Sequence, residues 1–195
     1  MNPINLIIAI NLFVSISANW SAAKKGLKST FTAVKERPSS YLQKIPPNIS
    51  ALALVLVILG IFNIGTLPEE WTNNYSVLRY IGLALFLLFS WLQVYAFKGL
   101  GKYYSQDVLI YKEHKLVNES MYKIIRHPQY LSQLLSDLGV GLALMSYLVL
   151  PLILLVEIPL FILRAKFEEK LLLKHFPEEY SEYKKKSGFF VPFIG

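Results

Sequence analysis

The chain has 195 residues, of which 54% are hydrophobic and only 17% charged, and its mean hydropathy is +0.42. Soluble domains carry about 25% charged residues, so the composition favours a membrane protein over an ordinary soluble domain. The absence of cysteine excludes a disulfide framework and a thiolate metal site.

Three apolar runs occupy the first half of the chain. A membrane-spanning helix needs about 20 mostly apolar residues, and the runs at 4–20, 49–67 and 78–97 meet or approach that length. The lysines follow the first run instead of preceding it, which favours a retained membrane segment over a cleaved leader. The polar stretch 24–47 is predicted to be a surface connector.

A longer apolar run follows at 131–163 and contains two glycines and two prolines. It is too long for one spanning helix and too short for two upright ones. We therefore predict a helical hairpin that turns near residues 145–147. The fold class is then all-α, a polytopic membrane protein with about five transmembrane helices, the last two forming the hairpin. A short amphipathic helix is expected on the cytosolic side at 176–186.

The positive charges predict the orientation of these helices. Of the 20 Lys and Arg residues, six lie in 24–44, six in 98–126 and seven in 164–195, which leaves only Arg79. The positive-inside rule places the three basic segments in the cytosol, with the N-terminus outside and the C-terminus inside. The net charge of +7 is thus a topology signal, and we expect a lipid bilayer and no nucleic acid as partner.

The motif Arg126-His127-Pro128-Gln129-Tyr130 stands immediately before the hairpin. Proline suits the first helical turn, so His127 is expected at the cap, where free backbone donors and the helix dipole can hold a carboxylate. The alternative is a capped helix with a snorkelling arginine.

The hairpin arms carry acidic residues at helical spacing. Tyr130 and Asp137 share one face of the first arm, and Glu157, Arg164 and Glu168 share one stripe of the second. Ionisable groups within a membrane are costly and usually face a cavity or a partner. This pattern predicts a pocket between the arms with Arg164 at its mouth, although acids that reach water near the interface are an equal alternative.

In their order and spacing, motifs over 98–195 resemble the isoprenylcysteine carboxyl methyltransferase family and its phospholipid methyltransferase relatives. They are His114-Lys115-Leu116-Val117, Tyr122, Arg126-His127-Pro128-Gln129-Tyr130, Arg164, Glu168-Glu169 and Glu178-Glu179-Tyr180-Ser181-Glu182-Tyr183-Lys184. The chain departs from the family at Ser120-Met121, where relatives usually have a glycine. The resemblance divides the chain into N-terminal membrane helices at 1–97 and a methyltransferase-type region at 98–195.

The resemblance implies S-adenosylmethionine as cofactor, bound at the cytosolic side without a Rossmann fingerprint, and no metal. It implies a lipophilic acceptor, such as an isoprenylcysteine carboxylate or another lipid, with Arg164 as the catalytic residue that orients it. Glu157 and Asp137 are expected to bind the acceptor, and either could act as a base for an amine or thiol. The cofactor-binding residues implied are His114, Lys115, Leu116, Val117, Tyr122, His127, Pro128, Gln129, Tyr130 and Glu168.

Two other functions fit the same sequence. One is a membrane reductase that uses NADPH on a sterol-like substrate, and the other is a transporter or membrane assembly subunit without enzymatic activity. The oligomeric state is left open.

Overall fold

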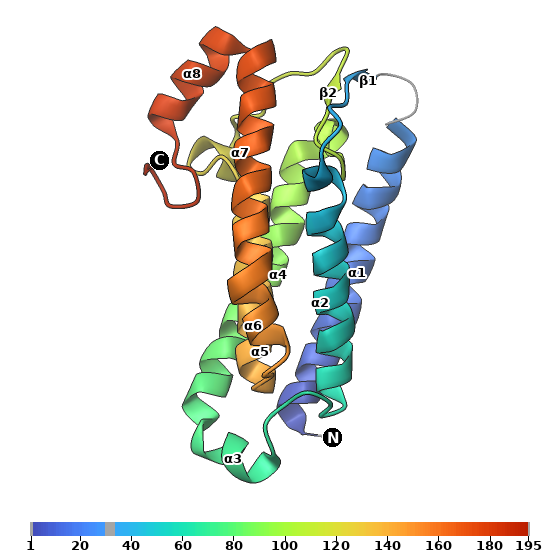
Figure 1. Ribbon diagram of the computed structural model, residues 1–195, viewed down its shortest axis with the longest axis vertical. Helices are drawn as coiled ribbons and strands as arrows, with labels where there is room; N and C mark the ends of the chain where they lie inside the picture. The colour runs from blue at the N-terminus through green and yellow to red at the C-terminus, as the bar shows by residue number, and fades with distance from the viewer. Residues whose placement is uncertain (1, 30–33, 195) are drawn as a thin grey trace.

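Long helices run side by side along the molecule (Figure 1), as the computed structural model shows for residues 2–29 and 34–194. Within these residues, three helical stretches are long and apolar enough to cross a membrane, at Pro3–Trp20, Tyr41–Ile61 and Ser76–Tyr103. The long helices are α1 (Pro3–Ser29), α2 (Ile45–Ile61), α4 (Ser76–Leu100), α5 (Pro128–Leu144) and α7 (Ile158–His175). The prediction of an all-α polytopic membrane fold is confirmed.

The ends of α1 and α2 differ from the predicted spans. Helix α1 continues to Ser29, so the predicted connector at 24–47 begins later than expected. Helix α2 begins earlier, at Ile45, because Pro46 and Pro47 fit its first turn, where no backbone N–H is needed. It also ends earlier, at Ile61, because the chain turns through positive φ angles at Asn63 (63°) and Gly65 (75°).

Helices α4 and α5 form the most extensive helix pair. Two glycines allow their backbones to touch. A Cβ atom at Gly82 would lie 2.6 Å from the Ala143 nitrogen, and one at Gly139 would lie 2.6 Å from the Phe86 nitrogen. Small residues let membrane helices approach closely in this way. A hydrophobic core that includes Ile8 and Phe86 joins α1, α2, α4 and α5 around this contact.

The predicted hairpin turns where expected. Helix α5 ends with Met145 in a left-handed conformation (φ 51°). The Ser146 hydroxyl then donates to the Gly65 carbonyl at 2.8 Å, which fixes the turn against the preceding loop. The second arm comprises α6 (Val149–Leu152), a π-helical turn (Ile153–Glu157) and α7. A π-helical turn inside an α-helix is uncommon and is often found at functional sites.

The remaining short elements gather mainly at one end of the bundle. They are β1 (Val34–Glu36), η1 (Tyr41–Gln43), η2 (Gly101–Tyr103), β2 (Ile110–Tyr111), η3 (Ser120–Lys123) and α8 (Pro177–Lys186), while α3 (Glu69–Asn74) lies at the opposite end. Strands β1 and β2 pair in antiparallel orientation. The predicted C-terminal helix is present as α8.

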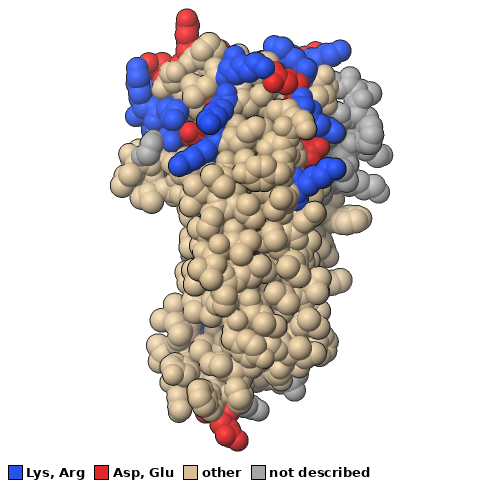
Figure 2. Space-filling model, in the orientation of Figure 1, with Lys and Arg blue, Asp and Glu red and all other residues tan. Residues whose placement is uncertain are grey.

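Charged residues follow the same division. Figure 2 shows Lys and Arg concentrated at the end that carries α8 and the β1–β2 pair, above a long stem that is almost free of charge on this face apart from acidic atoms at its foot. Arg79 lies near the other end, is buried, and donates from Nε to the Ala143 carbonyl at 3.0 Å. The predicted boundary between 1–97 and 98–195 falls in the last turn of α4, and both parts contribute to the bundle.

Candidate active site

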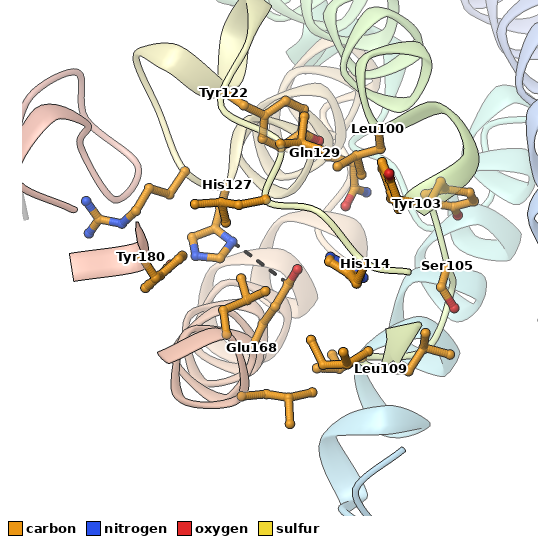
Figure 3. Close-up of a pocket in the computed structure, with 18 of the residues that line it drawn as sticks. Leu100, Tyr103, Ser105, Leu109, His114, Tyr122, His127, Gln129, Glu168 and Tyr180 are labelled. Carbon is orange, nitrogen blue, oxygen red and sulfur yellow. Dashed lines mark ion pairs between the residues drawn. The ribbon is translucent and has the colours of Figure 1, made fainter. Parts of the chain in front are cut away.

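A pocket opens at the charged end of the bundle, above the start of α5 (Figure 3). Its walls come from the loop between α4 and η3, the first turn of α5, the middle of α7, and α8. Aromatic and aliphatic side chains dominate the lining. The polar and charged residues among them are Ser105, Asp107, His114, Arg126, His127, Gln129 and Glu168.

His114 packs among aromatic rings at one side of the pocket. Its ring lies 5.3 Å from that of Tyr103 and 5.8 Å from that of Phe176, and it stacks on Tyr111 at 5.9 Å. Burial lowers the pKa of His114, because desolvation disfavours the imidazolium form. The ring is therefore uncharged at neutral pH and offers the pocket a polar but neutral edge.

The floor of the pocket joins α5 to α7. His127 is the N-cap of α5, with Pro128 in the first turn as predicted. Its ring stacks on Tyr130 at 5.6 Å with planes only 2° apart. The Tyr130 hydroxyl donates to Glu168 Oε2 at 2.9 Å, and His127 Nδ1 lies 3.9 Å from the same oxygen (Figure 3). The side chain of Glu168 is 35% exposed, so its carboxylate faces the pocket and remains accessible to a ligand.

A buried ion cluster supports this floor from below. Glu169 pairs with Arg126 Nε at 2.6 Å and with Lys184 Nζ at 3.1 Å, which ties α7 to α8. Burial alone would raise the pKa of Glu169, but contacts from His127 and Arg126 outweigh it and hold the pKa well below its usual range. His127 Nε2 lies 3.4 Å from Glu169 Oε1, outside hydrogen-bond geometry, and has no other partner among the described residues.

Arg164 lies beside the pocket lining and is 3% exposed. Its Nε donates to the Tyr130 hydroxyl at 3.1 Å. Its terminal nitrogens donate to the backbone carbonyls of Leu42 at 2.7 Å, Gln43 at 3.1 Å and Gln106. The guanidinium group thus joins three separate segments of the chain, and most of its donors are engaged.

A line of polar side chains leads from the pocket into the stem. Gln129, which lines the pocket, donates to Gln133 Oε1 at 3.3 Å. Gln133 Nε2 donates in turn to Ser50 Oγ at 2.7 Å and to Glu157 Oε1 at 3.4 Å, and the Ser50 hydroxyl donates to Glu157 Oε1 at 2.7 Å. Glu157 is 0% exposed, and its Oε2 has no hydrogen-bond partner among the described residues. Asp137 lies on the same arm as Gln133, one turn deeper, and is half-buried.

The structure brings most of the predicted cofactor residues together. Exposed Lys115 and buried Pro128 are outside the pocket lining, and the other predicted positions belong to it: His114, Leu116, Val117, Tyr122, His127, Gln129, Tyr130 and Glu168. Arg164, Glu157 and Asp137 are not lining residues. Arg164 reaches the pocket through Tyr130, and Glu157 reaches it through Gln133 and Gln129.

Several residues of the site were missed by sequence reasoning. Tyr180 and Tyr183 of α8 line the pocket, whereas the sequence placed them in an amphipathic helix and a family motif without giving them a binding role. Gln43 precedes α2 and bonds to the pocket wall, yet nothing in its neighbourhood marks it as part of a site. The contact of Gln43 joins backbone atoms 65 residues away, which no local pattern encodes.

Comparisons with known proteins identify this arrangement. The family model for phospholipid methyltransferase matches residues 77–179. The protein-S-isoprenylcysteine O-methyltransferase of Saccharomyces cerevisiae is 35% identical over 116 residues, which are 58% of this chain and 48% of that protein. Protein-S-isoprenylcysteine O-methyltransferase B of Arabidopsis thaliana is 28% identical over 151 residues, which are 74% of each chain.

A solved structure has the same fold. The eukaryotic intramembrane Ras methyltransferase ICMT superposes with a TM-score of 0.67 at 22% identity, covering all of this chain and 69% of that one. The resemblance drawn from residues 98–195 is confirmed, and it favours a methyltransferase over a reductase or a transporter. The family match covers more than half of the 195 residues, and the chain therefore belongs to the phospholipid methyltransferase family.

Proposed function

We propose that the protein is an integral-membrane methyltransferase that uses S-adenosylmethionine to methylate a lipophilic acceptor, either an isoprenylcysteine carboxylate or another lipid. The position of the pocket carries this proposal. Its lining residues belong to the charged end of the bundle, and Figure 2 shows an apolar stem beginning next to that end, so a water-soluble cofactor and a lipid-like acceptor can approach from different sides.

In this proposal the basic end of the bundle faces the cytosol. The two termini lie at opposite ends of the molecule (Figure 1), which supports an N-terminus outside and a C-terminus inside. The pocket then opens to the cytosolic supply of cofactor.

The pocket lining suits this cofactor. S-adenosylmethionine, when bound, supplies an electrophilic methyl group on a positively charged sulfur. The carboxylates of Glu168 and Asp107 line the pocket and suit the positive groups of such a ligand. The rings of Tyr103, Tyr104 and Tyr122 offer flat apolar faces to an adenine ring or a cation. His127, which is 5% exposed, adds a buried polar ring to this lining.

Arg164 acts as a positioning residue in this proposal. Its Nε donates a hydrogen bond to the Tyr130 hydroxyl, and this hydroxyl donates in turn to the Glu168 carboxylate. One arginine therefore orients two residues of the pocket floor. The prediction that Arg164 also contacts the acceptor stays a prediction, and its remaining hydrogen-bonding capacity is small. Methyl transfer depends mainly on alignment of the reacting groups, which a rigid floor provides.

We assign acceptor binding to Glu157 and Asp137. Ionisable residues at membrane depth usually serve a partner or pathway, and Glu157 retains an unpartnered oxygen in a fully buried position. The polar line through Gln133 and Gln129 connects the other carboxylate oxygen of Glu157, Oε1, with the cofactor pocket. A polar group on an otherwise apolar acceptor would find its contacts along that line.

Purified protein in detergent tests the proposal. Calorimetry should detect binding of S-adenosylmethionine, and Glu168→Ala should weaken it by about tenfold or more while the thermal unfolding temperature changes little. His127→Ala should weaken binding as well, with a lower unfolding temperature, because its buried ring also contacts Tyr130 and Glu169. Lys185→Ala, in an exposed pair on α8, is the control and should bind normally. Incubation with methyl-labelled cofactor and a total membrane lipid extract should yield a labelled lipid. No heat of binding on folded wild-type protein would refute the proposal.

A further inference from the structure

The wall of the pocket at residues 105–111 depends on a segment far away in the sequence. Residues 34–44, here called the strap, run beside this wall (Figure 1). Strand β1 of the strap pairs with β2 of the wall, and Arg37 lies 3.4 Å from Asp107. The strap lies outside the region 77–179 that the family model matches.

Gln43 makes the most specific contact between strap and wall. Its Oε1 accepts from the Val108 backbone N–H at 2.8 Å, and its Nε2 donates to the Val108 carbonyl at 2.7 Å. Both backbone groups of Val108 are thus held by one side chain, which takes the place of a neighbouring strand. Nε2 also donates to the Pro38 carbonyl at 3.0 Å, and Gln43 is 9% exposed.

Arg164 fixes the same junction from the other side. It donates to the carbonyls of Leu42 and Gln43 in the strap and of Gln106 in the wall. The strap itself is anchored to α7, since Glu36 accepts from Lys174 at 2.7 Å and lies 2.8 Å from His175 Nε2. The carboxamide of Gln43 links the strap directly to Val108, which lines the pocket, and it does so through two hydrogen bonds from a position that is only 9% exposed.

We propose that Gln43 is a positioning residue of the cofactor pocket, whose carboxamide holds the backbone of Val108 and so sets the shape of the 105–111 wall. This inference rests on the proposed function, since the ligand of the pocket is taken to be S-adenosylmethionine. It assigns a binding role to the N-terminal half of the chain.

The test compares Gln43→Ala with Asn48→Ala. Both remove a side-chain carboxamide, but Asn48 is exposed in the first turn of α2, outside the strap and the pocket lining. Gln43→Ala should weaken cofactor binding about tenfold by calorimetry, as expected for the loss of two buried hydrogen bonds. It should raise KM for the cofactor and leave kcat within about threefold. Asn48→Ala should behave as wild type.

Hydrogen exchange of the cofactor-free protein gives a readout without catalysis. The Val108 amide should exchange faster in Gln43→Ala, while the amides in the middle of α4 keep their protection. If Gln43→Ala fails to fold, Gln43→Met takes its place, because methionine preserves the side-chain volume. It should show the same changes in amide exchange and cofactor affinity. Gln43→Glu keeps the acceptor but loses both donor contacts, and its affinity should also fall.

Two results would overturn the inference. One is unchanged affinity for the cofactor and unchanged exchange at Val108 in folded Gln43 variants. The other is a lower unfolding temperature and lower kcat with unchanged KM, which is the pattern of a purely structural role. Failure of the wild-type protein to bind cofactor would instead refute the proposed function, so the two failures are distinguishable.

Discussion

The charged end and the stem of this protein are held together by different physical means. At the charged end, polar side chains bond to backbone atoms of distant segments, as Arg164 and Gln43 do. In the stem, the main contact is between helix backbones, made possible by Gly82 and Gly139. The difference teaches that the stem depends on the size of its side chains, while the pocket above it depends on their hydrogen-bonding groups.

The largest effect is expected from a substitution at the contact between α4 and α5 in the stem. Gly139→Leu would place side-chain atoms against the backbone of α4, where a Cβ alone would lie 2.6 Å from the Phe86 nitrogen. Overpacking costs about 1–3 kcal/mol in ordinary cores, and backbone atoms have no room to yield. We expect the variant to lose its monodisperse peak in size-exclusion chromatography. Ala51→Leu introduces the same leucine side chain at an exposed position of α2 and should leave the peak unchanged.

The next largest effect is expected from the loss of a buried hydrogen-bond donor at the charged end. Arg164→Leu replaces the guanidinium group with an apolar side chain and leaves the carbonyls of Leu42, Gln43 and Gln106 without their donor. Unsatisfied buried groups cost about 1–3 kcal/mol each, so the unfolding temperature should fall and methyl transfer should decrease by more than 100-fold. Lys166→Leu, at an exposed position on the same helix, is the control. Equal activity of the two variants would contradict the role given to Arg164.

A smaller effect is expected where the polar line enters the stem. Glu157→Gln preserves shape and can still accept from Ser50, but it changes the unpartnered oxygen into an amide group. KM for the acceptor should rise about tenfold, and the affinity for the cofactor should stay constant. Kinetics with each substrate varied in turn would separate the two. A variant that loses cofactor affinity instead would show that Glu157 belongs to the pocket floor.

The smallest effect concerns pH. Because burial lowers the pKa of His114 in the folded chain, the unfolded chain binds this proton first as pH falls. The contribution of His114 to stability is therefore complete above the ordinary histidine pKa of about 6.5 and decreases below it. Thermal unfolding at pH 7.5 and 5.5 should show a smaller pH dependence for His114→Phe than for wild type. The same pH dependence in both would contradict a buried neutral His114.

The elements that follow from hydrophobic length could be predicted, and those that follow from distant contacts could not. The hairpin turn and the cap at His127 were foreseen because apolar runs and a proline mark them locally. The extension of α1 to Ser29 was not predicted, because polar residues such as those after Trp20 can continue a helix or form a connector. Most implied pocket residues lie together, but Gln43 could not be found, because its partner Val108 lies 65 residues away.

The junction of strap and wall also has a consequence for biogenesis. Gln43 and Arg164 are 121 residues apart, so the strap leaves the ribosome long before the arginine that anchors it. Through that interval the carbonyls of Leu42 and Gln43 lack the donor that Arg164 provides in the folded chain. A truncated chain that ends before α7 would therefore insert its early helices but expose a strap without its contacts to α7. Such an exposed segment would be open to proteolysis.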